Sequence, residues 1–140
     1  MPKRERDALA RVPLFAGLAA RHLRRLADST EEQRYMEGSS VVREGDVGDT
    51  FYVILEGEAK VVSGGRRVVN RLQPGDFFGE ISLLDGGPRT ASVIADTPIT
   101  MLALPRKAFL RAIEQEPAVG VKLLAHAAGM LRRLERSPTG

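Results

Sequence analysis

Glu80 and Arg89 lie nine residues apart on a segment, residues 78–93, that begins as a loop. A carboxylate accepts hydrogen bonds from hydroxyl groups, and the planar guanidinium of arginine can donate two parallel hydrogen bonds to a phosphate. Gly79 would allow close approach of the backbone to a ligand. A Gly-Gly-Pro turn, residues 86–88, could leave Arg89 pointing inward. Together these residues could bind one hydroxyl and one anion, which is the chemistry of a sugar-phosphate.

The same residues have two simpler interpretations. An arginine is most often a surface residue, and a carboxylate near an arginine can form no more than an ion pair. Residues 81–84, by contrast, favour ligand binding, because they predict a short helical turn whose free N–H groups would face the same anion. From the residues alone, ligand binding and a structural ion pair therefore both stay open.

Composition predicts one folded domain, residues 1–140. Hydrophobic residues make up 43% of the chain and charged residues 28%, both near globular averages. The absence of cysteine excludes disulfides, a thiolate nucleophile and a cysteine-based zinc site, and it is compatible with a reducing compartment. No apolar run approaches the roughly 20 residues that span a bilayer. We therefore expect a cytoplasmic chain with no membrane segment.

The net charge of +3 is unevenly distributed, because residues 35–104 are acidic overall and both ends are basic. Basic ends could bind nucleic acid or another anionic partner, or they could be solvated helix faces. No DNA-binding motif is visible. His22 and His126 have no nearby metal-ligand pattern, and no nucleophile elbow accompanies Ser82. We expect no catalytic residue, no metal and no cofactor.

The hydrophobic period divides the chain into three parts. Residues 1–34 predict helices, because apolar residues recur three apart. Residues 35–104 have a hydrophobic period of two and predict short strands separated by glycine-rich turns, which is typical of a small roll or barrel. Residues 105–136 predict a helix pair, and residues 137–140 a tail. The fold class is therefore mainly β with flanking α.

The last helix carries a long apolar stripe. Its members recur at helical spacing over about five turns and are Val121, Leu124, Ala128, Leu131 and Leu134.

These residues and spacings resemble the cyclic nucleotide-binding domain family. Residues 78–84 and 88–93 are similar to the family's phosphate-binding cassette, and the turn glycines at Gly38, Gly45, Gly57 and Gly75 fall where the family has them. Residues 13–18 resemble the N-terminal helix of bacterial catabolite-activator-type sensors. The resemblance covers nearly the whole chain. It implies an eight-stranded, jelly-roll-like β-roll between N-terminal helices and a C-terminal helix pair.

The resemblance also implies roles for individual residues. Arg89 would pair with the cyclic phosphate, and Glu80 with the Gly79 backbone would take the ribose 2′-hydroxyl. The other cassette residues expected at the ligand are Ile81, Ser82, Leu83, Thr90 and Ala91, which would contribute mainly backbone groups. The base would rest against Val62, Asn70 and Leu72. The lid expected on the last helix is Leu124, His126, Ala127 and Leu131.

The expected function is that of a stand-alone cyclic-nucleotide sensor of the catabolite-activator or gated-channel type. Thr90 follows the arginine where several cAMP-selective members have alanine, so cGMP stays open, although cAMP is favoured. Signalling would proceed through movement of the cassette and the C-terminal helix, with a homodimer or an effector protein bound through the helices. Two alternatives remain: a nucleotide-independent interaction module, and the detached sensor of a transcription regulator or channel.

Overall fold

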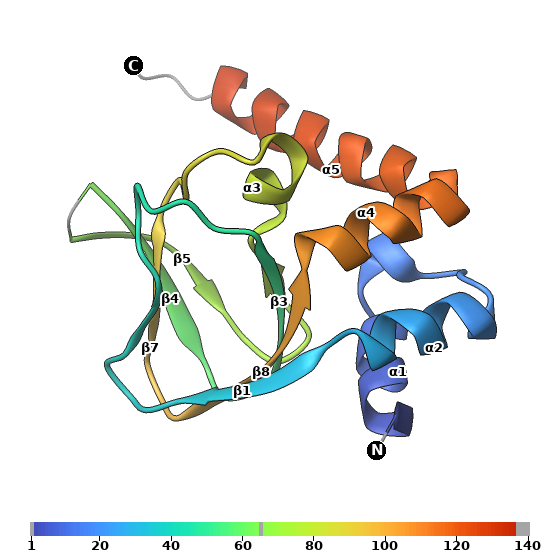
Figure 1. The fold of residues 1–140 in the computed structure, drawn as a ribbon. Coiled ribbons are helices and arrows are strands. Elements are labelled where there is room, and N and C mark those ends of the chain that lie inside the picture. The colour runs from blue at the N-terminus through green and yellow to red at the C-terminus, as the bar shows by residue number, and fades with distance from the viewer. Residues whose placement is uncertain (1, 65, 137–140) are drawn as a thin grey trace.

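The structure, a computed structural model, describes residues 2–64 and 66–136 (Figure 1). Its helices are α1 (Pro2–Ala10), the 3-10 helix η1 (Pro13–Phe15), α2 (Ala20–Asp28), α3 (Glu80–Asp85), α4 (Arg106–Gln115) and α5 (Pro117–Arg136). Its strands are β1 (Glu31–Tyr35), β2 (Ser40–Val42), β3 (Thr50–Glu56), β4 (Ala59–Ser63), β5 (Arg67–Leu72), β6 (Phe77–Phe78), β7 (Ser92–Ala95) and β8 (Ile99–Pro105). Gly65 and the tail expected at 137–140 lie outside the described residues.

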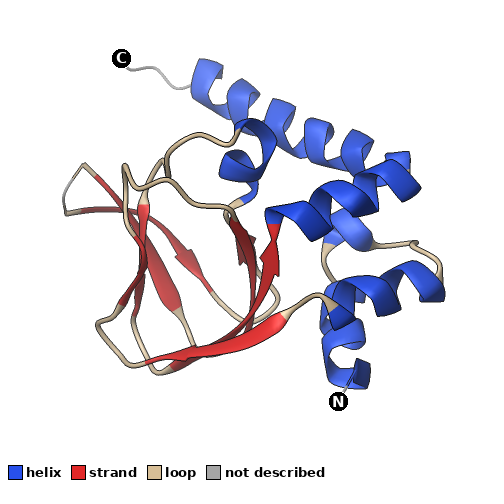
Figure 2. Cartoon of the chain, in the orientation of Figure 1, coloured by secondary structure: helices blue, strands red, loops and turns tan. Residues whose placement is uncertain are grey.

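The strands of the described part form two four-stranded antiparallel sheets, with the orders β1-β8-β3-β6 and β2-β7-β4-β5. Figure 2 shows the strands gathered on one side of the molecule and the helices on the other. Alternate residues of the central strands point into a core that includes Ile54, Met101 and Val93. The predicted mainly β roll with flanking helices is confirmed.

A second core joins the helices to the sheet that contains β3. Phe15 of η1, Phe51 of β3 and Phe109 of α4 are fully buried and pack ring against ring, with centroids 5.2 to 5.9 Å apart. Leu83 of α3 is buried in the same cluster. The helices and α3 therefore share one apolar interior. None of the described helices is both long and apolar enough to cross a membrane.

The expectation that residues 1–34 are helical is wrong from Glu31 onward. Residues 31–35 form β1, which pairs along its whole length with β8, from Glu31 opposite Ala103 to Tyr35 opposite Ile99. The sequence of β1 is polar and mostly exposed, so it carries little hydrophobic alternation. Its conformation is set by the partner strand, since main-chain pairing with β8 does not depend on the β1 side chains.

The apolar stripe predicted on the last helix faces solvent. Val121, Leu124 and Leu131 are 60 to 66% exposed, and the Leu134 side chain lies outside the described part of the chain. The face that packs inward instead carries Val119 and Leu123, each 1% exposed. Because α5 has apolar residues on two sides, the sequence pattern alone did not identify the buried one.

Candidate functional site

A cavity of about 180 Å³ opens where the second sheet meets α3 and α5. Nine of the predicted site residues line it: Gly79, Glu80, Ile81, Ser82, Arg89, Thr90 and Ala91 from the cassette, and Asn70 and Leu72 from β5. Further lining comes from residues that sequence reasoning did not name, which are Val42, Val61, Phe77, Phe78, Val93 and Met130. One wall of the cavity is therefore polar, and the other is built from apolar side chains of the roll.

Arg89 is the buried cation of this cavity, with only 6% of its surface exposed. Its Nη2 donates to the carbonyl oxygen of Thr50 at 2.9 Å. Its Nε and Nη1 are buried and have no hydrogen-bond partner among the described residues. Burial lowers the pKa of the guanidinium below its ordinary value, and the nearby Tyr52 and Asp49 offset this only in part.

Two glycines make room for the guanidinium. A Cβ placed on Gly48 would lie 2.2 Å from Arg89 Nε, and a Cβ on Gly79 would lie 2.8 Å from Arg89 Nη1. Gly79 also has a φ of +95°, a conformation that other residues rarely adopt. The two orphaned donors of Arg89 therefore lie in a slot that only side-chain-free residues can form.

The backbone around Arg89 is held by the turn between β2 and β3. Arg89 N donates to Asp46 O at 2.8 Å, and Gly45 N donates to Arg89 O at 2.9 Å. The Ser92 hydroxyl accepts a hydrogen bond from Glu44 N at 2.9 Å. These contacts fix the backbone at the start of the segment that carries the arginine.

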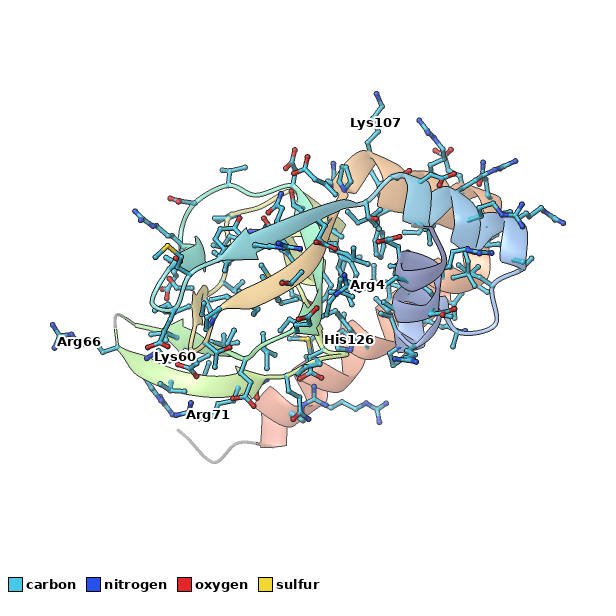
Figure 3. All side chains as sticks on the ribbon, turned by 90° about the horizontal axis from the view of Figure 1, so that it is seen from below. Arg4, Lys60, Arg66, Arg71, Lys107 and His126 are labelled. Carbon is cyan, nitrogen blue, oxygen red and sulfur yellow. The ribbon has the colours of Figure 1, made fainter. Side chains whose placement is uncertain are left out.

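Glu80 faces the same cavity from the first turn of α3 and contacts α5. Its Oε2 lies 2.6 Å from Nε2 of His126, with side-chain exposures of 12% for Glu80 and 31% for His126. Figure 3 places His126 at the junction between the roll and α5. The residues are 46 positions apart in the chain. Neither sequence period nor spacing could have indicated this contact.

Leu83 does not line the cavity. It is 1% exposed and belongs to the core shared with the helices. Its carbonyl oxygen accepts a hydrogen bond from Arg106 Nε at 2.9 Å, and Arg106 N donates to Asp49 O at 2.7 Å. Leu83 therefore connects the cassette to the first residue of α4, and its side chain supports α3 from beneath.

Val62 does not line the cavity either, and Val61 takes that place. The pairing of β4 with β5 shifts register between Val61, opposite Asn70, and Val62, opposite Val68. A bulge leaves an extra residue in one strand and re-aims the side chains that follow it. The expected position on β4 was thus one residue too late, because the bulge is not visible in the hydrophobic pattern.

Of the four expected lid residues, the structure brings only His126 to Glu80. Leu124 and Leu131 are 63% and 60% exposed and do not line the cavity, so their assignment to a lid is corrected. Ala127 is half-buried and does not line it. Met130, one turn beyond His126, is the α5 residue that reaches the cavity. Its spacing of four from His126 was the available signal.

The arrangement offers one buried, under-bonded cation and one carboxylate acceptor beside an apolar wall. Such a site suits a ligand with an anionic group, a hydroxyl donor and a flat apolar part. No cluster of histidine and acidic residues suited to holding a metal ion occurs among residues 2–64 and 66–136.

Comparison with known proteins gives one consistent family. The model of the family described as "Cyclic nucleotide-binding domain" matches residues 32–116. A cAMP-dependent protein kinase regulatory subunit from Colletotrichum orbiculare is 37% identical over 128 residues, which cover 91% of this chain but 30% of that protein. The chain thus spans less than a third of that relative's length.

Two solved structures have the same fold. Thermus thermophilus catabolite activator protein is 34% identical with a TM-score of 0.79, over 88% of this chain and 60% of that one. The regulatory domain of Toxoplasma gondii PKA, crystallised with cAMP, is 30% identical with a TM-score of 0.80, over 92% and 50% respectively. The chain belongs to the cyclic nucleotide-binding domain family.

Proposed function

We propose that this chain binds a 3′,5′-cyclic nucleotide in the cavity beside α3 and acts as a sensor module. The observation that carries the proposal is Arg89, whose Nε and Nη1 are buried without a partner. An unpaired buried charge is costly, and an anion placed against the guanidinium removes that cost. A cyclic phosphate has the two-oxygen edge that a guanidinium fork matches.

The other parts of the ligand find matching surfaces. Glu80 supplies an acceptor for the ribose 2′-hydroxyl, and the base would rest against Val61, Asn70 and Leu72 across the cavity. We propose cAMP as the preferred ligand over cGMP. This is supported by the relatives, which include a cAMP-dependent kinase subunit and a regulatory domain crystallised with cAMP. Thr90 lines the cavity and leaves some cGMP affinity open.

Signalling would be a shift between two arrangements of the cassette and the C-terminal helices. A phosphate drawn onto Arg89 acts on α3, and α3 is tied to α4 by the hydrogen bond from Arg106 to Leu83 O. Glu80 ties the same short helix to α5 through His126. Ligand binding at the cassette therefore has two polar contacts through which it can move α4 and α5.

Titration calorimetry with cAMP and with cGMP tests the proposal. We expect heat and a 1:1 stoichiometry with cAMP at micromolar protein, and weaker binding of cGMP. At a ligand concentration of 100 Kd the protein gains about 2.7 kcal/mol, which raises Tm by roughly 10 °C. No heat and no change of Tm with either nucleotide would favour the alternative, a nucleotide-independent interaction module.

We propose further that α5 pairs with a second copy of this chain through its outer stripe, Val121, Leu124, Ala128 and Leu131. All four side chains are exposed. Their spacing of three, four and three residues is that of a two-stranded coiled-coil seam, which is self-complementary. A monomer would leave this stripe in water along much of the helix.

The oligomeric state is measured by sedimentation velocity. The double substitution Leu124→Glu with Leu131→Glu should convert a dimer to a monomer, because like charges would face each other in the seam. The control is Leu110→Glu, which makes the same chemical change on the exposed side of α4 and should leave the dimer intact. A monomeric parent chain would leave an effector protein as the partner of the stripe.

We also propose that the chain is a binding module and not an enzyme, a single domain located in the cytoplasm. These assignments rest on the regulatory character of its relatives and on the sequence. The binding test applies equally to a domain that works alone and to the sensor part of a larger regulator or channel, because either arrangement keeps the site.

A further inference from the structure

His126 contacts Glu80 from the side opposite the nucleotide cavity, and this affects how Glu80 can recognise a ligand. Glu80 lines the nucleotide cavity and also a second hollow of about 680 Å³, which we call the outer groove. His126 lines the outer groove but not the cavity. The histidine therefore reaches the carboxylate from behind, on the side away from the ligand.

The Glu80 carboxylate can accept hydrogen bonds from His126 and from a ligand hydroxyl at the same time. Its two oxygens offer about four acceptor sites, and it cannot donate. His126 Nε2 therefore donates to Oε2 at 2.6 Å, and acceptor sites remain for a hydroxyl in the cavity. Either the neutral or the protonated imidazole supplies the donor.

The imidazole itself is held in place. Its ring packs against Phe77 with centroids 5.3 Å apart, and Phe77 packs against the fully buried Phe51 at 5.4 Å. The other charged side chains that line the outer groove are Arg11, Arg71, Asp76 and Arg133. No hydrogen bond from any of these four to Glu80 or His126 is present in the described part of the chain.

We propose that His126 is a positioning residue for Glu80: by donating from α5, it aims the carboxylate at the ribose 2′-hydroxyl, so that α5 adds to the selection of ligands carrying that hydroxyl. The inference rests on the proposed function, since it requires a cyclic nucleotide in the cavity. It assigns α5 a role in hydroxyl recognition in addition to covering the site through Met130.

The test compares two ligands, cAMP and 2′-deoxy-cAMP, by titration calorimetry. The ratio of their dissociation constants measures the contribution of the hydroxyl contact. In the parent protein we expect 2′-deoxy-cAMP to bind about tenfold more weakly or worse, because a hydrogen bond to a charged group is lost. If His126 positions Glu80, removing the histidine side chain must change this ratio of dissociation constants.

Three variants are compared with the parent. His126→Ala should shrink the ratio by about threefold or more, mainly by weakening cAMP. His126→Gln keeps an N–H donor at similar reach and should restore most of the ratio. Arg132→Ala, an exposed position on the same helix, should leave the ratio unchanged. Circular dichroism melts confirm that each variant is folded.

The outcomes separate the two claims. If His126→Ala weakens both ligands equally, or weakens neither, the positioning role is overturned and the proposed function stands. A parent ratio of about one overturns the hydroxyl contact and with it the positioning role, again without touching nucleotide binding. If the parent binds neither ligand, the proposed function fails and this inference fails with it.

Discussion

Replacing Arg89 by methionine is expected to weaken cAMP binding by about 10- to 150-fold or more, the loss that follows removal of a charged hydrogen-bond donor. The same change should not lower the stability of the ligand-free protein. Arg89 is 6% exposed and leaves two donors unpaired. Methionine removes that buried charge and fills a similar volume. The one bond lost, to Thr50 O, is charge-assisted and worth about 1.5–3 kcal/mol, and removal of the buried charge offsets it.

Two measurements check this expectation together. Calorimetry gives the affinity, and urea unfolding of the ligand-free variant gives the free energy of unfolding. Arg89→Lys is the matched control, because it keeps the charge but not the planar fork, and it should bind more weakly than the parent yet more tightly than Arg89→Met. A methionine variant that binds cAMP as well as the parent would remove Arg89 from the site. One that loses several kcal/mol would make Arg89 a structural residue.

Gly48→Ala should greatly lower the affinity for cAMP while leaving the fold intact. The φ of Gly48 is outside the left-handed region, so alanine fits its backbone. Its Cβ, however, would lie 2.2 Å from Arg89 Nε and 2.5 Å from Arg89 Cζ. The guanidinium must leave the slot, and a displacement of about 1 Å at a positioned group can cost on the order of 100-fold.

The control for Gly48→Ala is Gly129→Ala on α5. There the new Cβ meets only Arg133 Nη1 at 3.7 Å, an ordinary contact, and alanine favours a helix over glycine by about 1 kcal/mol. This variant should melt higher and bind cAMP as the parent does. Equal affinities for Gly48→Ala and the parent, measured by calorimetry, would mean that Arg89 binds the ligand from another position or not at all.

The cassette could be predicted from the sequence because its determinants are local. Gly79 and Gly86, both with positive φ, flank the short helix α3, and glycine is the residue that such positions require. The turn that follows delivers Arg89 to the start of the next extended segment. The same locality explains why the helix pair expected over residues 105–136 agrees with the pattern.

What could not be predicted depends on partners distant in the chain. The polar strand β1 exists because β8 pairs with it. The bulge after Val61 is a property of two strands together. The contact from His126 to Glu80 requires knowing which side of α5 faces the roll, and the helix is apolar on two sides. Met130 was missed for the same reason.

The placement of α5 has a mechanical consequence. Its first turns are fixed, because Leu123 is buried and Lys122 donates to Ala16 O, whereas its contacts farther along are with the site itself. The 13 residues beyond Leu123 extend about 20 Å, so α5 is a lever with its fulcrum near Leu123. Over about 20 Å, a tilt of α5 by about 5° would move its C-terminal end by nearly 2 Å. Small rearrangements at Glu80 would thus be magnified where Leu131 and its neighbours meet a partner.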